Sequence, residues 1–250
     1  MDPLVLTIAI GAVAAGFVQG LSGFGFGLVA MSFWAWMLEP QLAAVLTVFG
    51  ALTGQVMATF SVRRGFDLKM LLPFLIGGVV GIPIGVGLLP LLDAHLFKAL
   101  LGLLLAVWCP LMLFSKDLPA IRAGGRLADG TVGLLGGIMG GIGGFTGVLP
   151  TLWCTLRRLD KHTQRAIIQN FNLATIAFTM VAYVASGMVT RAMLPMFAVV
   201  APAMLVPTYL GTRLYIGISE VIFRRIVLSL LTASGIALLA SSAHHFLGLS

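Results

Sequence analysis

The N-terminal region contains an uncharged stretch that no soluble domain could accommodate. No charged side chain occurs from Pro3 to Leu38, and Glu39 is the only charge between Asp2 and Arg63. A continuous helix of this length would measure roughly 54 Å, against a membrane hydrocarbon core of about 30 Å. The segment must therefore break within the membrane, and the run GLSGFGFG at 20–27 is the predicted break.

The composition places the rest of the chain in the membrane as well. Apolar residues make up 59% of the 250 residues and charged residues only 9%, where soluble domains carry about a quarter. The basic residues fall in short gaps between apolar runs, so the net charge of +7 indicates membrane topology and not nucleic-acid binding. Further uncharged runs lie at 70–92, 99–115, 130–156, 166–190, 192–212 and 226–250.

A second glycine cluster divides the chain into two similar halves. The run GGIMGGIGGFTG at 136–147 interrupts a segment that is again too long for one span. Superposing Gly27 on Gly147 gives two halves, each a broken segment followed by three ordinary spans. The sequence therefore predicts an all-α polytopic membrane protein with two transmembrane repeats, 1–115 and 129–250, joined by a polar linker at 116–128.

The distribution of Lys and Arg predicts how the broken segments lie in the membrane. If each crossed once, the basic residues would divide seven against eight, with no bias. If each returns to its own side like a hairpin, thirteen share one side and only Lys98 and Arg191 lie opposite. We therefore predict two hairpin-like segments plus six full spans, with the linker cytoplasmic and both termini non-cytoplasmic. The second repeat is then inverted relative to the first.

The two glycine breaks predict a single central binding site. Non-helical backbone at membrane depth is tolerated where it lines a cavity, and helices that begin after a break present free N–H groups and a positive dipole end. Ser22 and Thr146 add hydroxyl groups, while Gln55 and Asn172 lie in the helices that directly follow the breaks. These groups suit a small oxyanion. The alternative is that the glycines only allow helices to pack closely.

Other kinds of site find no support in the sequence. Cys109 and Cys154 lie inside apolar runs, and the adjacent His244 and His245 cannot both face one metal ion from a helix. No nucleophile is paired with a base, and GxxxxGK[ST] does not occur. We therefore expect no enzyme activity, no cofactor and no metal site, and a secondary carrier if the protein transports.

Two blocks of sequence resemble a known family. GFVQGLSGFGFGLVAM at 16–31, together with GGIMGGIGGFTGVLPTLW at 136–153 and LDKHTQRA at 159–166, is similar to the sulfite exporter TauE/SafE family over nearly the whole chain. The first block lacks the proline that family members often carry after the first cluster, which leaves the subgroup and its substrate open. The resemblance implies an inner-membrane permease, with export as the expected direction, for sulfite, thiosulfate or organosulfonates.

The expected mechanism is alternating access around a midplane site between the glycine-broken helices. The expected partners are a small anion and the lipid bilayer, without nucleic acid, and a homo-oligomer stays open. Two other functions stay open as well, a non-transporting membrane scaffold subunit and a small-anion channel. The predicted substrate-binding residues are Ser22, Gly23, Gly25, Gly143, Gly144 and Thr146, with Gln19, Gln55 and Asn172 as second choices.

Overall fold

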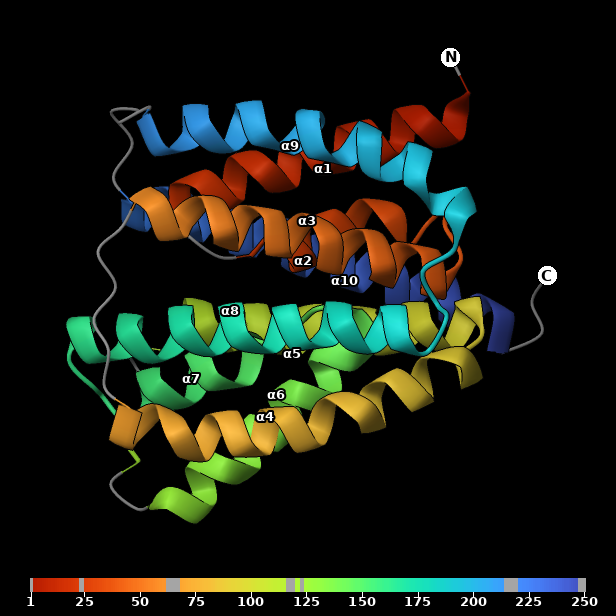
Figure 1. Ribbon diagram of the computed structural model, residues 1–250. Coiled ribbons are helices and arrows are strands. Elements are labelled where there is room, and N and C mark those ends of the chain that lie inside the picture. Colours follow the sequence, from red (N-terminus) through yellow and green to blue (C-terminus); the bar gives the residue numbers. More distant parts are fainter. Residues whose placement is uncertain are drawn as a thin grey trace.

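The structure is a bundle of helices that lie roughly along one axis (Figure 1). The computed structural model describes residues 2–22, 25–61, 68–115, 120–121, 124–213 and 220–246. The helices found in these ranges are α1 (Pro3–Ser22), α2 (Phe26–Trp34), α3 (Pro40–Ser61), α4 (Leu68–Leu88), η1 (Leu89–Leu91), α5 (Ala94–Leu113), α6 (Arg126–Gly143), α7 (Val148–Leu156), α8 (Lys161–Ala185), η2 (Arg191–Met193), α9 (Leu194–Arg213) and α10 (Glu220–Phe246).

The chain breaks at both glycine clusters. A long helix and a 9-residue helix form each broken segment, α1 with α2 and α6 with α7, and three long helices follow each pair. The all-helical membrane fold is thereby confirmed. Seven helices of the described chain are long and apolar enough to cross a membrane, namely α1, α3, α4, α5, α8, α9 and α10.

These candidates, which rest on length and composition, are one more than the six full spans predicted beside the two hairpin-like segments, and that arrangement stays a prediction. The additional candidate is α1, whose 20 uninterrupted residues can cross a bilayer before the break. Its counterpart α6 has 18 residues and is less apolar, because it carries Arg126, Asp129 and a series of glycines. The helix α6 also begins three residues inside the segment predicted as linker.

Glycine stripes join α4 and α6 along their length. Glycines recur at every fourth position in both helices, at Gly77, Gly81 and Gly85 in α4 and at Gly133, Gly137 and Gly141 in α6. A Cβ atom on any of them would collide with the backbone of the other helix. Two of the seven glycines in the second cluster, Gly137 and Gly141, therefore allow close packing against α4, as the alternative interpretation held.

The other half of the molecule contains the corresponding contact. The helix α1 packs against α9, where a Cβ on Gly16 or Gly20 would collide with the backbone of Met204 and Thr208, respectively. Thr208 Oγ1 donates a hydrogen bond to the Gly16 carbonyl at 2.9 Å. The first helix of each half thus packs against the helix before last of the other half. An inverted repeat predicts such reciprocal pairing, and the inverted relation of the two halves stays a prediction.

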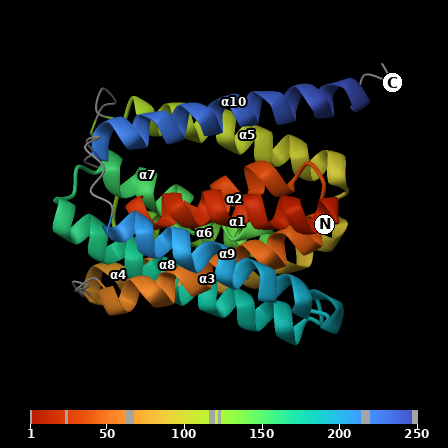
Figure 2. The ribbon, with the colours of Figure 1, turned by 90° about the horizontal axis from the view of Figure 1, so that it is seen from above.

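These two helix pairs lie on opposite outer faces of the bundle. The pair α1 and α9 forms one face and the pair α4 and α6 the opposite face, with the remaining helices between them (Figure 1). Seen from above, α5 and α10 lie side by side along one edge (Figure 2). The start of α1 and the end of α10 lie at the same end of the bundle, whereas α6 and α8 begin at the other (Figure 1).

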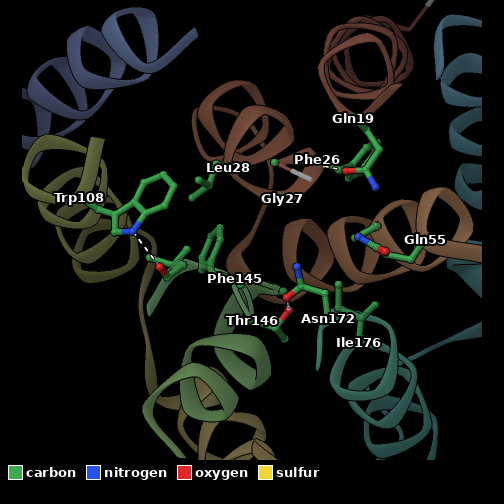
Figure 3. Close-up of a pocket in the computed structure, with 15 residues that line it drawn as sticks. Gln19, Phe26, Gly27, Leu28, Gln55, Trp108, Phe145, Thr146, Asn172 and Ile176 are labelled. Atoms are coloured by element: carbon green, nitrogen blue, oxygen red, sulfur yellow. Dashed lines mark hydrogen bonds between the residues drawn. The ribbon is translucent and has the colours of Figure 1, made fainter. Parts of the chain in front are cut away.

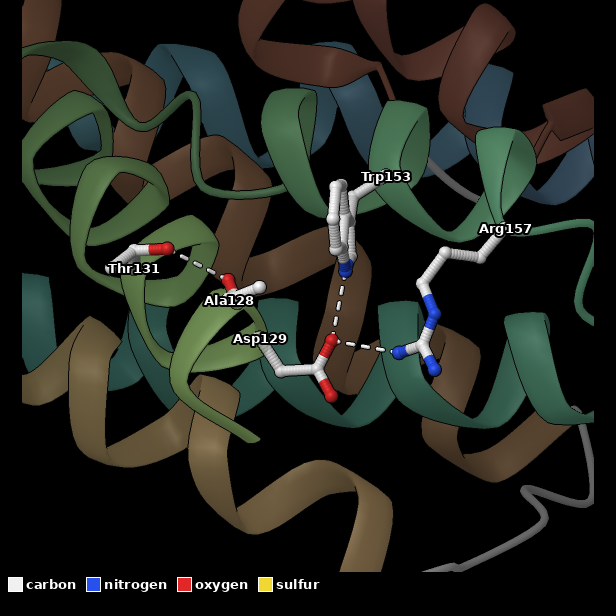
Figure 4. Close-up of polar contacts among 5 residues, drawn as sticks. All are labelled: Ala128, Asp129, Thr131, Trp153 and Arg157. Atoms are coloured by element: carbon white, nitrogen blue, oxygen red, sulfur yellow. Dashed lines mark hydrogen bonds and ion pairs between the residues drawn. The ribbon is translucent and has the colours of Figure 1, made fainter. Parts of the chain in front are cut away.

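A polar cluster ties the start of α6 to the end of α7 (Figure 4). Asp129 Oδ1 accepts hydrogen bonds from Trp153 Nε1 and from the Arg157 guanidinium, both at 2.8 Å. The Arg157 guanidinium carbon lies 6.0 Å from the centre of the Trp153 ring. The Ile121 N–H donates to the Leu156 carbonyl at 3.0 Å, so the linker is attached to the same end of α7. This cluster holds the two arms of the second broken segment together.

Candidate functional site

A small buried cavity lies where the two broken segments meet (Figure 3). Its volume is about 40 Å³, which is room for roughly three water molecules. Both breaks contribute to its wall, together with α3, α5 and α8. The lining residues are Gln19, Gly25, Phe26, Gly27, Leu28, Ala51, Gln55, Trp108, Gly144, Phe145, Thr146, Gly147, Val148, Asn172 and Ile176.

The first break presents an amide side chain to the cavity. Gly25 has a φ of 96°, a left-handed conformation that favours glycine, and it immediately precedes α2. The N–H of Phe26, the first residue of α2, donates to Gln19 Oε1 at 3.2 Å. Only 3% of the Gln19 surface is exposed, and its Nε2 has no hydrogen-bond partner among the described residues. The break thus leaves a buried donor beside the cavity.

The second break is held by a buried hydrogen bond to α8. Gly144 has a φ of 77° and ends α6, and its N–H donates to the Gly140 carbonyl at 2.8 Å. Thr146 Oγ1 donates to Asn172 Oδ1 at 3.0 Å. A Cβ on Gly147 would lie 2.7 Å from Asn172 Nδ2, so glycine is needed for the Asn172 side chain to lie there. The amide of Asn172 is therefore fixed against the break.

The two breaks approach each other directly. A Cβ on Gly27 would lie 3.3 Å from the Gly144 carbonyl oxygen and 3.3 Å from Thr47 Cγ2. A Cβ on Gly144 would likewise lie 3.3 Å from Thr47 Cγ2. Any larger residue at Gly27 or Gly144 would therefore intrude on the junction of α2, α3 and the second break.

The electrostatics of the cavity favour an anion. Helices α2 and α7 both begin at its wall, and the first N–H groups of a helix have no partner within the helix. The dipoles of the two helices place partial positive charge at these ends. None of the 15 lining residues has an ionisable side chain. The wall thus combines the starts of two helices with side-chain amides and the Thr146 hydroxyl, which donates to Asn172, and these residues carry no formal charge.

The comparison with protein families gives a clear result. Residues 8–238 match the family model described as Sulfite exporter TauE/SafE. The chain belongs to this family. No curated protein and no solved structure matches it. TauE/SafE proteins are membrane transporters and not enzymes, and the multiple apolar helices of this chain agree with that class.

The TauE/SafE cavity brings together most of the residues that were predicted to line a site. Gln19, Gly25 and Gln55 come from the first half, and Gly144, Thr146 and Asn172 come from the second. That these six residues bind substrate stays a prediction.

Three predicted residues do not lie at the cavity or cannot be placed. Gly143 does not line it, because it is the last residue of α6 and its Cβ direction faces the ring of Phe145. The side chain of Ser22 and the whole of Gly23 lie outside the described residues.

The sequence interpretation missed the aromatic part of the TauE/SafE cavity. Phe26 and Phe145 each follow a left-handed glycine, so the repeated Gly-Phe pair was a signal that could have identified them. Trp108 reaches the cavity from α5, and its Nε1 donates to the Val148 carbonyl at 2.8 Å, at the first residue of α7. No local pattern distinguishes Trp108 from the lipid-facing and core residues of its span.

Proposed function

We propose that this protein is a secondary transporter that exports small sulfur-containing anions, such as sulfite, thiosulfate or organosulfonates. The substrate binds in the cavity between the two breaks. One observation carries the proposal: polar residues from both breaks and from the helices that follow them line one buried cavity. A purely structural role for the glycines would not require Gln19, Gln55, Thr146 and Asn172 to meet there.

The chemistry of the wall supports an oxyanion as the substrate. Oxyanions accept hydrogen bonds and are favoured at helix N-termini, and the cavity is lined by the starts of two helices and by the side-chain amides of Gln19, Gln55 and Asn172. Sulfur is suggested by the family alone. The mechanism we propose is alternating access, in which movement of the broken segments exposes the cavity first to one side of the membrane and then to the other.

Counterflow in proteoliposomes tests this function. Vesicles loaded with unlabelled sulfoacetate should accumulate labelled sulfoacetate transiently, because a carrier exchanges substrate across the membrane faster than it transports it net. Labelled acetate should not accumulate, since the family match points to sulfur oxyanions. Saturable exchange supports the carrier. Flux that does not saturate and shows no counterflow identifies a channel, and the absence of flux with every sulfur anion leaves the scaffold subunit.

The proposed orientation is tested by cysteine labelling. Cys109 and Cys154 are both buried, so the wild-type background should label weakly. In intact cells, a membrane-impermeant maleimide should react with Ser186→Cys, between α8 and α9, because we propose that this end is non-cytoplasmic. Ala120→Cys, at an exposed position of the linker, should react only after the membrane is opened. The reverse pattern would invert the proposed topology.

A further inference from the structure

We infer that the groove between α4 and α6, on the outer face of the bundle, binds an anionic phospholipid. This inference does not depend on which ion the protein transports. The groove has a volume of about 670 Å³, and the first parts of α4 and α6 form its walls. Both helices begin at the same end of the bundle (Figure 1), so the groove starts near the membrane surface and runs toward the middle of the bilayer.

Most of the groove is apolar and open to lipid. Its wall along α4 is formed by Leu72, Ile76 and Val80, which recur at every fourth position and are all exposed. The opposite wall includes Leu127 of α6, which is exposed as well. From Lys69 to Val80 the helix rises by about 16 Å, close to half of a hydrocarbon core of about 30 Å. The groove therefore has the depth of one leaflet, which is the depth that the acyl chains of a phospholipid occupy.

Two cations lie at the surface end of this apolar groove. Lys69 on α4 and Arg126 on α6 both line it, and both side chains are exposed. Each lies in the first turn of its helix, where the helix dipole disfavours a positive charge. The stability of the two helices therefore does not account for these cations. A cation on each wall of an apolar groove is complementary to the phosphate of a lipid whose acyl chains fill that groove.

The acidic residues near the two cations do not neutralise this end of the groove. Asp129, the acidic residue in the first turn of α6, forms an ion pair with Arg157 at 2.8 Å. The sequences that lead into the two helices, 62–69 and 116–126, carry six Lys and Arg and two Asp. The surroundings of the groove entrance are therefore net positive, so an anionic lipid should bind better than a zwitterionic one.

Cations at helix ends also determine membrane topology, but that role does not require a groove between them. Lys161 and Arg165 provide the comparison. They are exposed in the first two turns of α8, at the same end of the bundle, and do not line the groove. Replacing either pair by glutamine removes two positive charges from this end. The two double variants thus separate a lipid site from the general charge of the surface.

Native mass spectrometry of the detergent-purified protein tests the inference. Phosphatidylglycerol and phosphatidylcholine with the same acyl chains are added in equal amounts. The wild type should bind phosphatidylglycerol about tenfold more tightly or better, equivalent to about 1.4 kcal/mol. The double variant Lys69→Gln, Arg126→Gln should bind both lipids within about twofold of each other. The double variant Lys161→Gln, Arg165→Gln should keep the preference of the wild type.

Two results of this experiment would overturn the inference. One is equal affinity of the wild type for the two lipids. The other is an equal loss of preference in both double variants, because the preference would then reflect the total charge at this end of the bundle and not a site between α4 and α6.

Ile76→Trp tests the apolar part of the groove and leaves both cations in place. Ile76 lines the groove, so an indole at this position fills the space that an acyl chain needs. The affinity for phosphatidylglycerol should fall by about tenfold. Val79→Trp is the matched control, because Val79 is exposed on the same helix and does not line the groove. It should bind phosphatidylglycerol as the wild type does.

Ile76→Trp also decides the question if the double variant at Lys69 and Arg126 fails to fold. Unchanged affinity for phosphatidylglycerol in a folded Ile76→Trp variant would refute a lipid in this groove. The Tm provides a second measurement, because a ligand that binds the folded state stabilises it. Phosphatidylglycerol should raise the Tm of the wild type and of Val79→Trp, but not that of Ile76→Trp.

Discussion

Gly81→Val is expected to destabilise the protein strongly, because Gly81 packs directly against the backbone of α6. A Cβ at this position would collide with the Leu134 carbonyl and lie 2.9 Å from the Ile138 nitrogen, both in the backbone of α6. Backbone atoms cannot rotate aside, so the two helices must separate along their glycine stripes. Overpacking costs about 1–3 kcal/mol where side chains can adjust, and we expect at least the upper figure here. The Tm of the purified protein should fall by about 6–12 °C.

The same helix supplies the control for this experiment. Gly87 lies near the end of α4, and a Cβ there would have no neighbour within 4 Å. Gly87→Val therefore adds the same side chain to the same helix without touching α6, and its Tm should stay within about 2 °C of the wild type. Equal shifts for the two variants would show that the α4–α6 contact does not depend on the glycine stripes.

Gly144→Leu is expected to abolish transport in a protein that still folds. Gly144 lines the cavity with a φ of 77°, and its Cβ would lie 3.2 Å from Val48 Cγ2. A leucine here carries the backbone cost of a left-handed residue, about 1–2 kcal/mol, and also intrudes on the junction of the two breaks. Binding of methanesulfonate should weaken by about a hundredfold or more, equivalent to about 2.7 kcal/mol, and sulfoacetate counterflow should disappear.

A control variant at Gly187 separates the effect of backbone strain from the effect of a side chain that intrudes on the cavity. It has a φ of 76°, nearly that of Gly144, but a Cβ there would meet nothing within 4 Å, and it lies outside the cavity. Gly187→Leu therefore carries the same backbone strain and should lower the Tm without loss of counterflow. If both variants lose transport to the same extent, the loss reflects strain, and the cavity at Gly144 is not the transport site.

The sequence was sufficient to predict the arrangement of helices in broad terms. Uncharged runs of known length against a membrane of known thickness require the breaks, and glycine clusters are the segments least able to continue as helix. The same reasoning predicted that Gln19, Gln55, Thr146 and Asn172 lie at one site, because both breaks must lie where a cavity can satisfy the hydrogen bonds of their backbone.

The orientation of individual residues and the exact limits of the helices could not be predicted from the sequence, because they depend on contacts between distant segments. Gly143 and Gly144 are neighbours in one cluster, yet only the direction of the chain after α6 decides which of them faces the cavity. The additional candidate span arises because α1 continues to Ser22 before it breaks, a boundary that the glycines at 20–27 do not fix. Asp129 bonds to Trp153, which is 24 positions further along the chain, and to Arg157, which is 28 positions further along. No local periodicity predicts such a contact.

The contact between α1 and α9 also determines when the molecule is completed during its synthesis. Thr208, whose hydroxyl bonds the Gly16 carbonyl, follows Gly16 by 192 residues. A ribosome needs roughly 10 to 40 seconds for that stretch at about 5–20 residues per second. Throughout this time the glycine face of α1 is without its final partner. The nascent first helix must therefore be kept in the bilayer by lipid or by the insertion machinery.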